Sequence, residues 1–138
     1  KAGEEHMPKE LFWLVLTVAM TGLFWVPYIL DRVLVRGLMG AMANPSPDDT
    51  PQSAWAQRQM KAHTNAVEGL VIFAPLVIVA QMLQISTGAT VFACALYFWA
   101  RLVHFLVYSF GIPVVRTLSF AAGWVAQVML VLAICGWG

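Results

Sequence analysis

The chain has 138 residues, of which 60% are hydrophobic and only 11% are charged. A soluble domain of this length exposes more charge, so the composition favours a membrane protein over a soluble one. The net charge of +1 excludes the general basic field of a nucleic-acid-binding protein, and no nucleic-acid partner is expected. A bilayer core is crossed by about 20 apolar residues of helix, and several charge-free runs in this chain reach that length.

These runs predict an all-α, multi-pass integral membrane protein, folded as a four-transmembrane-helix up-down bundle. The four spans are expected at about residues 10–30, 66–85, 89–110 and 114–136. A soluble, buried helical bundle is disfavoured because no span shows the polar outer face that such a helix needs. The apolar run of the first span is longer than the signal-peptide core of about 7–15 residues, and no small-residue cleavage site follows it.

The domain is expected to be single and to cover residues 7–138. Residues 1–6 precede Met7, which looks like a natural start, so they are expected to be an added segment. The cysteines, Cys94 and Cys135, fall near the outer ends of spans three and four. A disulfide between them is geometrically possible, but two buried apolar thiols are the favoured interpretation.

The first loop divides two helical stretches. Its segment "ANPSPDDTP", at 43–51, holds three prolines and two aspartates, which forbid a continuous helix. The next helix is expected to run from about 54 to 85, with Ser53 as its N-cap and a kink at Pro75.

Short turns connect the later spans and set their direction. The turns are "STG" at 86–88 and "GIP" at 111–113, and connections this short make antiparallel neighbours. Basic residues concentrate in the first and third loops, at Arg32, Arg36, Arg58, Lys61 and Arg116. The positive-inside rule then places these loops in the cytoplasm and both termini away from it.

Polar residues gather where spans two, three and four meet the cytoplasmic side. On a helix of 100° per residue, four of them share roughly an 80° arc of the span-two helix: Arg58, Lys61, Asn65 and Glu68. In span three, Arg101, His104 and Tyr108 share roughly a 60° arc, while His63 points elsewhere. Arg116 opens span four.

This arrangement predicts a site for an anionic ligand that enters from the cytoplasm. Arginine holds carboxylates through paired hydrogen bonds, and an ion pair between Glu68 and Arg101 is expected to join spans two and three. The same residues also fit a plainer interpretation. Interfacial cations touch lipid phosphates, an arginine can snorkel, a histidine can be a satisfied core residue, and a tyrosine can belong to the interfacial belt. The histidines show no metal-ligand spacing, and no catalytic triad or phosphate loop is present.

Two segments carry a family resemblance: "RQMKAHTNAVEGLVIF", followed by "ARLVHFLVYSFGIPVVRTLSF". Over about residues 7 to 138 the chain resembles the MAPEG family, the membrane-associated proteins in eicosanoid and glutathione metabolism. The resemblance implies a four-helix transmembrane fold, assembled as a homotrimer among membrane lipids. It also implies that glutathione binds between neighbouring subunits at the cytoplasmic side.

The resemblance further implies roles for individual residues. Arg116 matches the arginine that polarises the thiol of glutathione and would be the catalytic residue. Lys61 would lie next to the glutathione backbone, and Glu68 would hold its amino group or an arginine. The remaining matches to the glutathione site are Asn65, Arg101, His104 and Tyr108. Arg58 is added to this set because it belongs to the same cluster of basic residues.

The sequence departs from the family pattern at four positions. Lys61 lacks the planar fork of arginine, Thr64 stands where some members have a second arginine, and Phe120 stands where some have a tyrosine. Thr117 replaces a serine and keeps the hydroxyl. These departures bear on activity more than on fold. The family also includes a non-catalytic lipid-binding protein.

The leading hypothesis is a glutathione-dependent membrane transferase or peroxidase that acts on lipophilic electrophiles or hydroperoxides. The alternative is a non-catalytic lipid- or partner-binding protein of the same fold. A small transporter or channel that uses Glu68 and His104 is disfavoured, because the chain has no paired broken helices or inverted halves. A bacterial inner membrane and an endoplasmic reticulum membrane both suit the compact helices.

Overall fold

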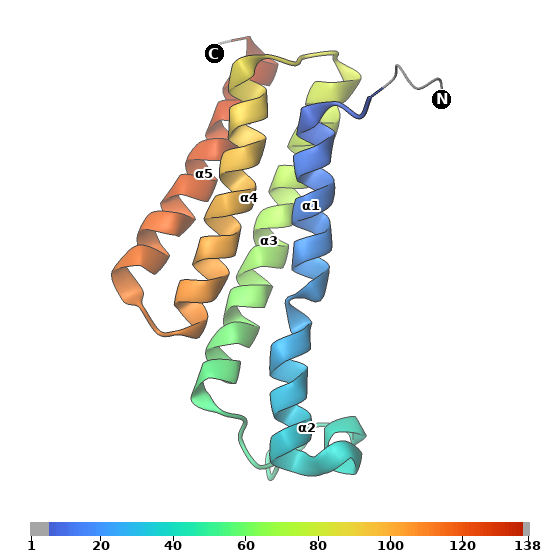
Figure 1. The fold of residues 1–138 in the computed structure, drawn as a ribbon, viewed down its shortest axis with the longest axis vertical. Coiled ribbons are helices and arrows are strands. Elements are labelled where there is room, and N and C mark those ends of the chain that lie inside the picture. Colours follow the sequence, from blue (N-terminus) through green and yellow to red (C-terminus); the bar gives the residue numbers. More distant parts are fainter. Residues whose placement is uncertain (1–5, 137–138) are drawn as a thin grey trace.

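The computed structural model describes residues 6–136, and within that range it is entirely helical apart from turns and loops. The helices are α1 (Lys9–Leu23), α2 (Trp25–Met42), α3 (Ala54–Met82), α4 (Gly88–Ser109) and α5 (Pro113–Cys135). α1 and α2 stack end to end as one long rod, and α3, α4 and α5 run up and down beside it (Figure 1). Four segments are long and apolar enough to cross a membrane, which confirms the predicted multi-pass helical fold.

The first span is longer than predicted. The expected segment, 10–30, is part of a candidate membrane-spanning helical segment that runs from Lys9 to Met42 and contains 34 residues. At about 1.5 Å per residue, the part that precedes Gly37 measures roughly 42 Å, beyond a bilayer core of about 30 Å. Its far end therefore extends past the bilayer core beside the beginning of α3 (Figure 1).

Two breaks interrupt this long segment, and each has a local cause. Phe24 separates α1 from α2, three residues before Pro27, which has no N–H to donate to the carbonyl of Leu23. Gly37 has a φ of 74°, a left-handed conformation that favours glycine, and it turns the last stretch of α2 aside. The predicted loop over 43–51 is non-helical, as expected, and α3 continues through Pro75.

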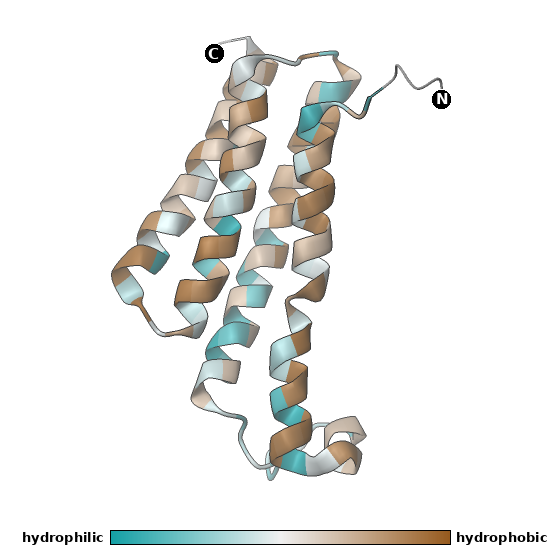
Figure 2. Cartoon of the chain, viewed as in Figure 1, coloured by the Kyte–Doolittle hydropathy of each residue, from teal (hydrophilic) through white to brown (hydrophobic). Residues whose placement is uncertain are grey.

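The core consists of two apolar clusters at different depths. The larger one joins α1, α3, α4 and α5 around Phe73 and Tyr97, whose rings stack with centroids 3.9 Å apart. The smaller one joins α1–α2 to α3 and α4, where Phe24 and Phe105 stack at 3.7 Å. Large apolar side chains remain exposed along the helices, the outer surface expected of a protein that contacts lipid. The colouring of Figure 2 shows that hydrophobic residues occur along all of these helices.

Polar contacts hold both ends of the first rod. At the end where the described chain begins, Glu10 is buried and accepts hydrogen bonds from Ser86 (2.8 Å) and Thr90 (2.6 Å). Thr90 and Thr87 also form a capping box at the start of α4. Glu10 thereby ties α1 to the first turn of α4.

At the opposite end, Asp31 ties α2 to the start of α3. Its carboxylate is 4% exposed and accepts from the Ser53 hydroxyl (2.5 Å), the Ser53 amide (3.0 Å) and Gln52 (3.3 Å). Ser53 is the N-cap residue of α3 as predicted, but its hydroxyl donates to Asp31 instead of capping the helix backbone. One turn before Asp31, Tyr28 is hydrogen-bonded to His63 of α3 at 2.7 Å.

Gly69 permits a close approach of α3 to α4. A methyl group placed on Gly69 would lie 2.5 Å from the Tyr97 hydroxyl, inside the van der Waals limit. Gln127 of α5 donates to the carbonyl of the same glycine at 3.1 Å. The three helices therefore meet at one small residue in the interior of the bundle.

The cysteines are free thiols, as the favoured interpretation predicted. Cys94 is buried in the larger core cluster, which agrees with that interpretation. Cys135 is exposed, and the prediction that it is buried is wrong, because it lies in the last turn of α5 beyond the packed part of the bundle.

We expect Asp31→Ala to lower the free energy of unfolding by about 2 kcal/mol, because it removes the acceptor of the half-buried Ser53 amide and hydroxyl and one of the two acceptors of the buried Gln52 amide. Thermal unfolding in mild detergent measures the change. Asp48→Ala is the matched control, since Asp48 is exposed on the loop, and it should change the midpoint little. Equal unfolding midpoints for the two variants would show that the contacts of Asp31 do not stabilise the fold.

We expect Gly69→Ala to destabilise the bundle by about 1–3 kcal/mol, because the added methyl group collides with the Tyr97 hydroxyl. Tyr97→Phe removes that oxygen, so the double variant should recover much of the loss. Gly22→Ala is the control, because no atom lies within 4 Å of its added methyl group. No recovery in the double variant would show that the contact at Gly69 is not the limiting one.

Candidate functional site

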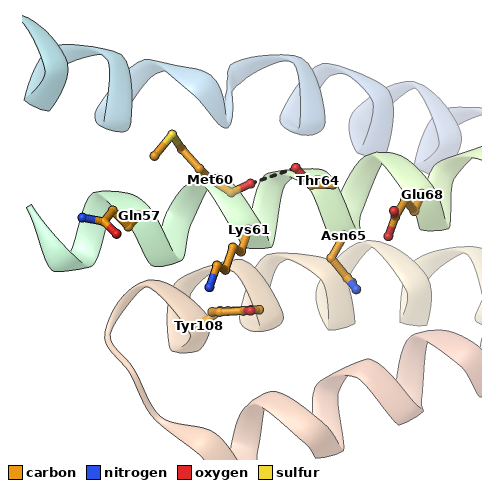
Figure 3. A pocket seen from close by; sticks show the side chains of 7 residues that line it. All are labelled: Gln57, Met60, Lys61, Thr64, Asn65, Glu68 and Tyr108. Carbon is orange, nitrogen blue, oxygen red and sulfur yellow. Dashed lines mark hydrogen bonds between the residues drawn. The ribbon is translucent and has the colours of Figure 1, made fainter. Parts of the chain in front are cut away.

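Three side chains predicted for the site line up along one face of α3. Lys61, Asn65 and Glu68 border a cavity of about 430 Å³ together with Tyr108 of α4. Figure 3 shows these side chains, with Tyr108 lying below Lys61. The spacing of four and then three residues keeps them on one helix face, as the sequence predicted. Lys61 and Glu68 are exposed on the isolated chain, whereas Asn65 is half-buried.

A second cavity, of about 260 Å³, lies between α3, α4 and α5. Asn65, His104, Tyr108 and Arg116 line it, together with Thr117 and Phe120. The guanidinium carbon of Arg116 lies 4.8 Å from the centroid of the Tyr108 ring, a cation–π contact. His104 meets the same ring edge to face at 5.5 Å. Tyr108 therefore supports the arginine at the start of α5.

A third cavity, of about 220 Å³, lies deeper in the bundle. Asn65 and Glu68 border it from α3, and Arg101 borders it from α4. Arg101 is 3% exposed, and its Nη2 donates to the Asn65 side-chain oxygen at 2.6 Å. Asn65 lines all three cavities, so they lie next to one another around this residue.

The predicted ion pair between Glu68 and Arg101 is wrong. Among residues 6–136 the ion pair within 4.0 Å is Arg36–Asp49, at 3.5 Å, in the first loop region. Arg101 donates to Asn65 instead, while Glu68 is exposed on the isolated chain. Asn65 lies one turn before Glu68 on α3, so Arg101 had two possible partners on the same helix face.

Arg58 shares the helical arc of the other site residues but has a different environment. Its Nε donates to the carbonyl of Ser109 at 3.0 Å, and its guanidinium packs against Gly111 in the turn after α4. Gln59 bonds to the Ser109 hydroxyl at 3.2 Å. These contacts satisfy the C-terminal end of α4, where cations are favourable, and Arg58 lines none of the three cavities.

The structure adds residues to the region that sequence reasoning did not single out. Tyr97 and Gln127 line the deepest cavity beside Arg101. Tyr97 precedes Arg101 by four residues and so shares its helix face, and Gln127 is a lone amide in an apolar span. Both signals were present in the sequence. His63 points away from the site toward Tyr28, as predicted.

The geometry also provides groups that fit glutathione, which carries carboxylates, an ammonium group and a thiol. Lys61 and Arg116 are cations and Glu68 is an anion. Lys61 and Glu68 border the first cavity, and Arg116 borders the second, adjacent one. The buried Nδ1 of His104 has no hydrogen-bond partner within the described part of the chain, which leaves a polar atom available for a ligand.

Comparison with known protein families identifies the family of this chain. No curated protein matches the chain at a significant level. The family model of the MAPEG family matches residues 6–136, which is nearly the whole chain and includes every site residue described above. The four membrane-spanning helical segments agree with the four-helix membrane fold of that family. The chain therefore belongs to the MAPEG family.

Proposed function

We propose that this protein is a glutathione-dependent membrane transferase or peroxidase that acts on lipophilic electrophiles or hydroperoxides. The observation that carries the proposal is the position of Arg116, which rests on the Tyr108 ring and borders a cavity with His104 and Asn65. A fixed cation at a cavity wall is the group that thiol chemistry requires. Membership of a family of glutathione and eicosanoid metabolism agrees with this reaction class.

Arg116 would act by electrostatics. A cation beside a thiol lowers its pKa and favours the thiolate, which is the reactive form. When bound, glutathione would supply this nucleophile. The contact with Tyr108 restricts the guanidinium, so little reorganisation is needed when charge develops.

The other residues would hold and orient the tripeptide. The Lys61 ammonium suits a carboxylate of glutathione, and the Glu68 carboxylate suits its ammonium group. Asn65 is already bound to Arg101 through its oxygen, which leaves the amide N–H groups free to donate. Arg101 would position Asn65, and Arg58 would support the site from the end of α4.

Assembly into a homotrimer would complete the site. Lys61 and Glu68 are exposed on the isolated chain although they belong to a membrane-spanning helix. Charged groups in a span normally face protein or water instead of lipid, so a neighbouring subunit is the natural cover. The lipophilic substrate would arrive through the bilayer. The placement of basic residues supports an orientation with both termini away from the cytoplasm, in a bacterial inner membrane or an endoplasmic reticulum membrane.

Arg116→Ala should reduce turnover of a lipophilic electrophile with glutathione by at least about a hundredfold, because the developing thiolate loses its cation. Turnover is measured on the purified protein in mild detergent. The thiolate itself is followed by its ultraviolet absorbance as glutathione is added.

Arg116→Lys is the matched variant, since it keeps the charge and loses the planar fork, and it should retain part of the thiolate signal. Val114→Ala controls for a change of side chain in the same turn, because Val114 is exposed and lines none of the three cavities. Full activity in Arg116→Ala would rule out this role for the arginine.

A second experiment separates catalysis from the non-catalytic alternative, in which the polar cluster serves only assembly. Glu68→Gln keeps the shape of the side chain and removes its charge. If Glu68 holds the ammonium group of glutathione, binding measured by calorimetry should weaken about tenfold while chemical cross-linking still reports trimers. Loss of trimers with no effect on glutathione affinity per folded subunit would favour the alternative.

A further inference from the structure

The last stretch of α2 leaves the long rod sideways. Gly37 has a φ of 74°, and the helical residues that follow it project from the end of the rod, across its axis (Figure 1). The Ala43 amide ends this stretch by donating to the carbonyl of Met39 at 3.1 Å. We name residues 38–42 the bent segment. It lines none of the three cavities of the candidate site, so the proposed glutathione chemistry gives it no role.

The bent segment exposes large apolar side chains. Leu38 is 62% exposed, Met39 is 76% exposed and Met42 is 65% exposed. Leu34, which lies on α2 just before Gly37, is 84% exposed. Four large apolar side chains exposed within nine residues indicate a surface that contacts a membrane or a partner, because water is a poor environment for them.

The length of the rod places this surface at the level of the lipid headgroups. The straight part of the rod, from Lys9 to Arg36, measures roughly 42 Å at about 1.5 Å per residue. A bilayer with its headgroups is about 40–45 Å thick. Lys9 therefore begins the rod in one headgroup layer, and Gly37 lies in the other. At that depth, a segment that turns across the rod axis runs along the membrane surface.

The apolar surface continues the lipid-facing side of the rod. Leu30 ends the charge-free run of the first span and is 57% exposed. Leu34 follows it by four residues and so shares its face of α2, and the bent segment comes directly after Gly37. This continuity favours the bilayer over a separate protein partner as the group that covers the bent segment.

The cations beside the bent segment are engaged by the first loop. The Nε of Arg36 donates to the carbonyl of Thr50 at 2.8 Å, and its Nη1 lies 3.5 Å from the Asp49 carboxylate. Arg32 donates to the carbonyl of Ala43 at 3.4 Å. These contacts connect the straight part of α2 to the loop that follows the bent segment.

The charge of this region gives no preference for anionic lipids. Residues 31–50 contain two arginines against three aspartates, so they carry no excess of positive charge. Attraction between a basic segment and anionic headgroups, which holds many peripheral helices on membranes, is therefore missing here. Apolar contact is the force that remains.

We propose that the bent segment docks on the surface of the bilayer that the chain spans. Leu38, Met39 and Met42 insert at the boundary between headgroups and acyl chains, and Leu34 contacts the same layer. The lipid is bound by apolar contact, whatever the charge of its headgroup. This contact fixes the direction in which the first loop leaves the rod before it returns to Ser53 and α3. The inference does not depend on the proposed glutathione chemistry.

Spin labels on the full chain in liposomes test this placement. One label replaces Met39 and, in a second sample, another replaces Met42. The reference label replaces Asp48, which is exposed on the first loop. All samples carry Cys135→Ser, because the thiol of Cys135 is exposed and would take up label, whereas Cys94 is buried. Collisions of each label are measured with oxygen, which concentrates in the bilayer, and with a nickel chelate, which stays in water on both sides.

We expect the labels at Met39 and Met42 to collide more with oxygen than with the nickel chelate, at a depth of about 5–10 Å below the lipid phosphates. The label at Asp48 should show the reverse preference. The depth at Met39 and Met42 should be the same in liposomes of zwitterionic lipid and in liposomes with added anionic lipid. It should also be insensitive to salt, because apolar contact is not screened.

Three results would overturn the proposal. Preference for the nickel chelate at Met39 and Met42 would show that the bent segment lies in water. Low collision rates with both reagents would show that protein covers it, and short distances between labels on different chains would then identify a second copy as the cover. Insertion that occurs only with anionic lipid and is lost in high salt would show that charge, and not apolar contact, holds the segment.

Discussion

A guanidinium group buried inside a membrane-spanning bundle is the constraint on which the rest of this structure depends. Arg101 is almost fully buried, and removing its charge from water is expensive unless partners surround it. Asn65 supplies one such partner through a short hydrogen bond. This bond fixes how α4 lies against α3. Gly69 then allows the Tyr97 hydroxyl to approach the backbone of α3 one turn further along.

The same asparagine organises the candidate site. Because Asn65 lines all three cavities, any group bound beside Lys61 or Arg116 lies close to the residue that holds Arg101. Arg116 is supported separately, by the face of Tyr108. The cation proposed to act on the thiol and the cation buried in the bundle are therefore held by different contacts. A change at one need not displace the other.

The helices and the main polar residues could be predicted from the sequence because both leave periodic signals. Charge-free runs located the spans, and helical arcs correctly placed Lys61, Asn65 and Glu68 on one face. The helical arc gives the direction in which a side chain leaves its own helix. It does not show which side chain of the next helix lies within reach. For that reason the pairing of Glu68 with Arg101 was wrong, and the bond from Arg58 to the carbonyl of Ser109 was not foreseen.

The boundaries of the first span show another limit. The charge-free run placed the first span at residues 10–30, yet the helical segment continues to Met42, where Asp31 and Tyr28 attach α2 to α3. Tertiary contacts of this kind are invisible to hydropathy. Tyr97 and Gln127 were missed for a different reason: an isolated polar residue in an apolar span gives no pattern until its neighbours in space are known.

The tie between Glu10 and Thr90 has a consequence for how the protein is made. These residues are 80 positions apart, and the contact joins the first helix to the beginning of α4. During synthesis the first helix must enter the membrane well before its partner has left the ribosome. Until then the Glu10 carboxylate has neither hydroxyl to accept from. The contact between α1 and α4 therefore forms late in biogenesis, after α4 has been inserted.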